Sequence, residues 1–132
     1  MRRTGILIAA CLGFAPPALA LDCPGETQAA MDQCADAAYR KADDALNKEY
    51  QEITRRLKDD TATAKLLVSA QKAWIAFRDA ECAFSSSANV GGTIYPMVYS
   101  YCLERVTSAR VKELGVYLKC AEGDLGCPVP GE

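Results

Sequence analysis

The sequence predicts an all-α fold, a small disulfide-stabilised bundle of about three helices followed by an irregular C-terminal tail. Apolar residues recur every three or four positions along three long stretches, which is the period of a helix with one buried face. Six cysteines follow residue 20, an even number that is typical of a disulfide framework in a short exported chain. The length of 132 residues suits one hydrophobic core.

The first twenty residues differ in character from the rest and predict a signal peptide over residues 1–20. A basic start precedes an apolar run from Ile6 to Phe14, and Ala18-Leu19-Ala20 resembles a cleavage site with small residues. We therefore expect a mature single domain, residues 21–132, that is periplasmic or secreted.

Cys11 offers an alternative, because the residues before it have the composition of a lipoprotein cleavage box. That reading would shorten the apolar run to about five residues, below the roughly 7–15 of a signal core. We favour cleavage after Ala20. The mature chain is not expected to span a membrane, since no later segment approaches the roughly 20 apolar residues required.

The first helix is expected from about Thr27 to Leu57, ending before Lys58-Asp59-Asp60. Its predicted inward face carries Tyr39, Ala42, Leu46, Tyr50, Ile53 and Leu57.

The second helix is expected to begin with Thr61 or Thr63 as its N-cap. Its predicted inward face carries Leu67, Ala70, Trp74, Phe77 and Phe84. Small and polar residues from Ser85 to Gly92 predict the loop that ends it.

The third helix is expected to start near Tyr95-Pro96, because proline is favoured in a first turn, and to continue past Leu114. Its predicted inward face carries Val98, Tyr101, Cys102, Val106, Ala109 and Leu114. The tail, residues 119–132, is rich in proline and glycine and should be irregular.

The six cysteines of the mature chain are Cys23, Cys34, Cys82, Cys102, Cys120 and Cys127. Antiparallel helices joined near Val90 would place Cys82 and Cys102 at similar heights, while Cys23 could bond Cys34 and Cys120 could bond Cys127. A rival pairing joins Cys34 to Cys82, because the first two helices should also be antiparallel.

Charge and residue types exclude several functions. Without the signal peptide, 13 Lys and Arg stand against 17 Asp and Glu, so the net charge is −4. The bases form no stripe that would neutralise phosphates, which argues against nucleic-acid binding. The absence of histidine removes the usual general base and a common metal ligand. We expect no enzyme activity and no cofactor or metal.

Polar residues accompany the apolar stripes at helical spacing. They are Asp43, Asn47 and Tyr50 in the first helix, Gln71, Trp74, Arg78 and Asp79 in the second, and Thr107 and Arg110 in the third. A buried polar group without a partner costs about 1–3 kcal/mol. We therefore expect a structural network in which Arg78 or Arg110 pairs with Asp43. The alternative is a contact surface formed by Trp74, Arg78 and Asp79.

These residues, in this order, form a recognisable pattern. Its remaining members are Ala42, Leu46, Ala70, Phe77, Cys82, Gly91, Gly92, Thr93, Cys102, Leu103 and Leu114. From Cys23 to Leu114 the chain resembles the bacterial exported domains named for the N-terminal domain of the lysozyme inhibitor LprI. The resemblance implies a binding protein that inhibits lysozyme. The alternative is an envelope interaction or structural protein with another partner.

The predicted loop is the best candidate for entering the sugar-binding cleft of a lysozyme. Residues 85–93 include Gly91, Gly92 and Thr93, and the expected Cys82–Cys102 bridge would tether the loop closely. The alternative is a plain connection between helices.

Overall fold

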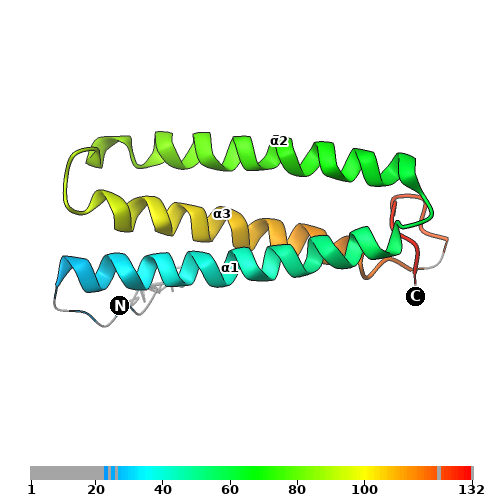
Figure 1. Ribbon diagram of the computed structural model, residues 1–132, viewed down its shortest axis with the longest axis horizontal. Helices are drawn as coiled ribbons and strands as arrows, with labels where there is room; N and C mark the ends of the chain where they lie inside the picture. Colours follow the sequence, from blue (N-terminus) through cyan, green and yellow to red (C-terminus); the bar gives the residue numbers. More distant parts are fainter. Residues whose placement is uncertain (1–22, 24, 26, 122, 132) are drawn as a thin grey trace, which may run out of the picture.

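The computed structural model describes residues 23, 25, 27–121 and 123–131, so the predicted signal peptide lies outside the described residues. It contains α1 (Gln28–Arg56), α2 (Thr61–Ser85), a short 3₁₀ turn η1 (Ser87–Asn89) and α3 (Tyr95–Tyr117). No strand occurs in the described part of the chain. The all-α prediction is confirmed, and the three helices fall close to their expected ranges (Figure 1).

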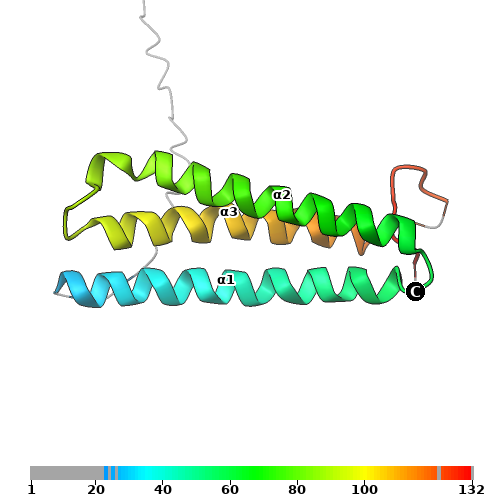
Figure 2. The ribbon, with the colours of Figure 1, turned by 45° about the horizontal axis from the view of Figure 1, so that its top comes forward.

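The three helices lie side by side and form a rod (Figures 1 and 2). Their lengths of 29, 25 and 23 residues correspond to about 34–43 Å at a rise of about 1.5 Å per residue. α3 packs along α1, whereas α2 packs mainly on α3 and lies at the edge of the bundle. The α2–α3 loop, residues 86–94, is at one end of the rod, and the C-terminal tail is at the other.

Local capping interactions fix where the helices begin. The Thr27 hydroxyl accepts a hydrogen bond from the N–H of Ala30, 3.2 Å away, and caps α1. Asp60, rather than Thr61 or Thr63, caps α2, because its carboxylate accepts from the N–H of Thr63 at 3.0 Å. Pro96 lies in the first turn of α3, as predicted.

Two apolar clusters form the core. The cluster near the tail contains Leu46, Ile53, Leu57, Leu114 and Val129. The cluster near the loop contains Cys82, Cys102, Leu103 and Val106, with Tyr39, Trp74 and Tyr99 packed against it. Val129 belongs to the irregular tail, so the tail is anchored to the bundle although it has no regular structure.

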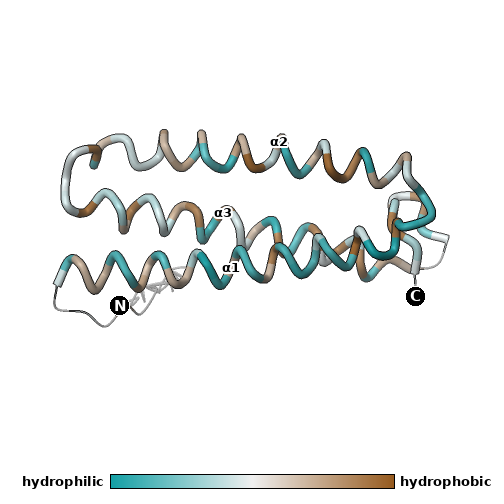
Figure 3. The backbone as a smooth tube through the Cα atoms, viewed as in Figure 1, coloured by the Kyte–Doolittle hydropathy of each residue, from teal (hydrophilic) through white to brown (hydrophobic). Residues whose placement is uncertain are grey.

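The predicted inward face of α2 is wrong in part. Ala70, Phe77 and Phe84 are exposed, and the buried residues of α2 are Gln71, Arg78 and Cys82. The reason is that α2 packs mainly against one neighbour, which covers one narrow stripe of its surface. Hydrophobic residues nevertheless occur along the whole of α2 (Figure 3). Those outside the covered stripe are exposed to solvent. In α3, Ala109 is likewise exposed.

Three disulfides connect the chain, and they pair Cys23 with Cys34, Cys82 with Cys102, and Cys120 with Cys127. Cys34 is thus bonded to Cys23, and the rival bond to Cys82 does not form. The Cys82–Cys102 bond joins α2 to α3 directly behind their connecting loop. The Cys120–Cys127 bond closes a small loop in the tail.

Candidate functional site

Arg78 is the centre of a polar and aromatic network between the helices. Its guanidinium carbon lies 5.3 Å from the ring centroid of Trp74 and 5.6 Å from that of Tyr39, so α1 and α2 both supply an aromatic face. Only 10% of the Arg78 side chain is exposed. Contacts of this kind favour a cation, and they are stronger where water is excluded.

Two carboxylates balance the charge of Arg78. Nη1 of Arg78 lies 3.5 Å from Oδ1 of Asp43 on α1, and Nε donates to Oδ1 of Asp79 at 2.9 Å. Nδ2 of Asn47 in turn donates to Oδ2 of Asp43 at 3.2 Å. The structure therefore brings the motif residues of α1 and α2 together, with Asp43 shared between them.

Arg110 extends the network to α3. Its guanidinium carbon lies 5.9 Å from the ring centroid of Trp74. Its Nε donates to Oε1 of Gln71 at 3.4 Å, and its Nη1 donates to Oε2 of Glu113 at 2.9 Å. Trp74 thus contacts two guanidinium groups. The side chains of this network come from all three helices.

Burial in this region also affects two tyrosines. Burial raises the pKa of the Tyr39 hydroxyl above its usual value, and the charge of Arg78 opposes this effect. Burial likewise raises the pKa of Tyr99, with the carboxylate of Asp79 acting in the same direction. Both hydroxyls are therefore neutral at physiological pH, which suits packing and hydrogen bonding rather than proton transfer.

The remaining motif residues lie elsewhere. Tyr50 packs against the cluster near the tail, and Thr107 is fully buried. The Thr107 hydroxyl has no hydrogen-bond partner within the described part of the chain. Gly91, Gly92 and Thr93 are exposed in the α2–α3 loop, away from the network.

The α2–α3 loop is short and ordered by backbone hydrogen bonds. The N–H of Val90 donates to the carbonyl of Ser87 at 3.3 Å, and the N–H of Gly92 donates to that of Asn89 at 3.0 Å. Gly91 has φ +82°, a conformation that favours glycine. Val90 is 70% exposed and is the more exposed of the two large hydrophobic residues of the loop, the other being Ile94 at 40%. The loop therefore has a defined backbone shape and an exposed apolar side chain.

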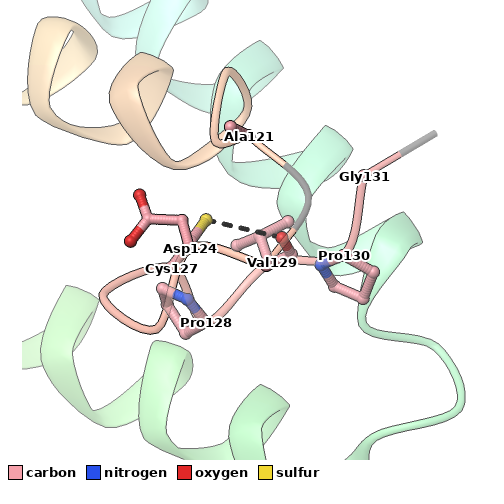
Figure 4. A pocket seen from close by; sticks show the side chains of 8 residues that line it. Ala121, Asp124, Cys127, Pro128, Val129, Pro130 and Gly131 are labelled. Atoms are coloured by element: carbon pink, nitrogen blue, oxygen red, sulfur yellow. Dashed lines mark hydrogen bonds between the residues drawn. The ribbon is translucent and has the colours of Figure 1, made fainter.

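A hollow of about 330 Å³ lies in the tail at the other end of the rod (Figure 4). Pro128, Val129 and Pro130 form much of its wall. Asp124 is the only ionisable side chain among its described lining residues, and its carboxylate accepts from the N–H of Gly126 at 2.8 Å. This arrangement offers a small contact surface and no pair of groups for acid–base chemistry.

Sequence reasoning missed two members of the network. Tyr39 was expected in the core, but its role as an aromatic partner of Arg78 was not anticipated. Its spacing of four residues before Asp43 was the available signal. Glu113 was not considered, although it lies three residues after Arg110 and forms an ion pair with it.

These features define a class of protein, a disulfide-tied helical domain with an internal arginine–aromatic network and an exposed loop at one end. The chain belongs to the lysozyme inhibitor LprI family, whose model matches residues 22–114. An uncharacterized protein of Rhizobium meliloti (strain 1021) is 37% identical over 107 residues, covering 73% of this chain and 77% of the relative. No solved structure matches.

Among the described residues, no helix is long and apolar enough to cross a membrane. No group of three or more Cys, Asp or Glu side chains among them is arranged to hold a metal ion.

Proposed function

We propose that this protein is an exported binding protein that inhibits a lysozyme-type peptidoglycan hydrolase. Family membership over residues 22–114 carries the proposal, because the family is described as a lysozyme inhibitor. The three disulfides support export, since such bonds persist in oxidising compartments. Inhibition requires binding and no chemical step by the protein itself.

The α2–α3 loop is the proposed contact. The Cys82–Cys102 bond and the turns within the loop limit its freedom, so little conformational entropy is lost when a partner binds. Within the described residues, no backbone carbonyl accepts from the N–H of Gly91 or of Thr93. These two groups could donate to the carboxylates that glycoside hydrolases place in their groove.

Net charge supports the encounter with a basic target. The mature chain expected from the sequence has a net charge of −4. A basic hydrolase would be attracted to it at low salt and less at high salt, because ions screen such attraction beyond about 10 Å at 0.1 M.

The test is the lysis of peptidoglycan by several lysozymes, with oxidised protein titrated in at two salt concentrations. We expect lysis to slow. Val90→Asp should weaken inhibition, because it places a carboxylate near those of the target groove. Leu125→Asp is the matched control, since it changes the net charge equally but at a fully exposed position in the tail.

Two results would count against the proposal. Undiminished lysis at a large molar excess, for every lysozyme and both salts, would refute inhibition. The second hypothesis, an envelope interaction or structural role with another partner, would then remain. Equal inhibition by Val90→Asp and Leu125→Asp would instead place the contact outside the loop.

A further inference from the structure

The outer face of α2 carries an apolar stripe that the bundle leaves uncovered. Leu66, Phe77 and Phe84 are 70%, 57% and 76% exposed, and all three lie on this helix. Ala70, Ala73 and Ala80 between them are exposed as well. We call these six residues the α2 stripe.

The spacing of the α2 stripe is that of a helix–helix contact. Its members, from Leu66 to Phe84, follow one another at intervals of four, three, four, three and four residues. At about 100° per residue they all fall within about 40° of one line along the helix. This is the seam of a coiled coil, in which apolar residues alternate at three and four positions.

The α2 stripe is large for a surface without a partner. At roughly 200 Å² per aromatic side chain, Phe77 and Phe84 alone leave about 270 Å² accessible. Leu66 and the three alanines bring the total to on the order of 500 Å². Two copies joined through it would bury on the order of 1,000 Å², the lower limit for a specific interface.

At the centre of the α2 stripe, the order of large and small residues suits an antiparallel pairing. If Leu66 lies opposite Phe84 of a second copy, Ala70 falls opposite Ala80, and Ala73 falls opposite Phe77. The small residue in the last pair leaves room for the phenyl ring of its partner. An antiparallel two-fold pair therefore avoids the meeting of Phe77 with Phe77 that a parallel pair in register would require.

We propose that two copies of this chain associate through the α2 stripe as an antiparallel, two-fold symmetric dimer. An interface of this area is at the small end of specific contacts, so we expect weak association. Such pairing places the two α2–α3 loops at opposite ends of the dimer. The proposal does not depend on what those loops bind.

Sedimentation equilibrium of the oxidised protein tests it. We expect a concentration-dependent monomer–dimer equilibrium in the wild type and a dissociation constant raised at least tenfold by Phe77→Glu or Phe84→Glu. Ile75→Glu is the matched control, because Ile75 is 40% exposed on a different face of α2 and its replacement should leave association unchanged. Circular dichroism establishes that each variant is folded.

A wild type that stays monomeric at 1 mM would overturn the proposal. So would a dimer that Phe77→Glu leaves intact, or a monomer whose lysozyme inhibition is lost on Phe77→Glu, since the stripe would then contact the hydrolase.

Discussion

Nη1 of Arg78 lies 3.5 Å from Oδ1 of Asp43, and this ion pair connects α2 with α1, two helices that otherwise touch little. The same guanidinium lies over the rings of Trp74 and Tyr39. Arg78 therefore holds the edge helix to the rest of the bundle through charge and aromatic contacts, where most bundles use aliphatic packing.

Replacing Arg78 should destabilise the protein strongly. Arg78→Ala removes two ion pairs and both aromatic contacts from a side chain that is only 10% exposed, and we expect a loss of about 2–4 kcal/mol in the free energy of unfolding. Urea unfolding followed by circular dichroism measures this. Arg40→Ala, at an exposed ion pair with Asp36, is the control and should cost less than about 1 kcal/mol. Equal losses would show that the network is not structural.

The Cys82–Cys102 bond should protect α2 more than the other helices. Cys82→Ala with Cys102→Ala removes a closure of 20 residues, worth about 3 kcal/mol in the entropic model. Because α2 packs mainly on α3, we expect amide hydrogen exchange to increase most in α2. Cys23→Ala with Cys34→Ala should leave α2 exchange largely unchanged. Uniform acceleration in all helices by the first variant would contradict this view of α2.

Two glycines should respond in opposite directions to alanine. Gly91 has φ +82°, so Gly91→Ala should cost about 1 kcal/mol although no atom lies within 4 Å of the added Cβ. Gly115 is helical, and its added Cβ would meet only Oε2 of Glu49 at 3.9 Å. Gly115→Ala should therefore stabilise by about 0.5 kcal/mol. Thermal unfolding of both variants measures the difference, and a shift of the same sign would contradict it.

Glu52 should titrate at unusually low pH. Its carboxylate accepts hydrogen bonds from Arg55 and Arg56, at 2.6 and 2.8 Å, which lower its pKa from 4.5 to about 2. Because the folded-state pKa is depressed, this contribution to stability is present above about pH 4.5 and is lost as the pH falls toward 2. An NMR titration of the side-chain carboxyl carbon measures the midpoint. Replacing both arginines with glutamine should return it to about 4.3.

The sequence predicted α1 better than α2, and packing explains the difference. Ala42, Leu46, Ile53 and Leu57 are buried as expected, because α1 has a single apolar face along most of its length. α2 carries apolar residues on more than one face, and helical spacing does not tell which face a neighbour covers. Only the position of α3 shows that Phe77 is exposed while Arg78 is buried.

The network was predictable in composition but not in geometry. Spacing identified Asp43, Arg78 and Arg110 as side chains that need partners, and it left open which arginine pairs with Asp43. The structure pairs Asp43 with Arg78, while Arg110 pairs with Glu113. That choice depends on the relative height of three helices, which is set by loop lengths and side-chain packing over the whole bundle.

Because of the Cys82–Cys102 bond, the α2–α3 loop can change in sequence during evolution with little effect on the fold of the rest of the protein. It closes the two helices behind residues 86–94 and is itself part of the nearer core cluster. Apart from the buried Ser86, substitutions and insertions in the loop therefore alter few contacts that keep the chain folded. Segments supported in this way acquire new specificities readily, because selection for recognition does not oppose selection for stability. A single bundle can then carry loops of many different sequences.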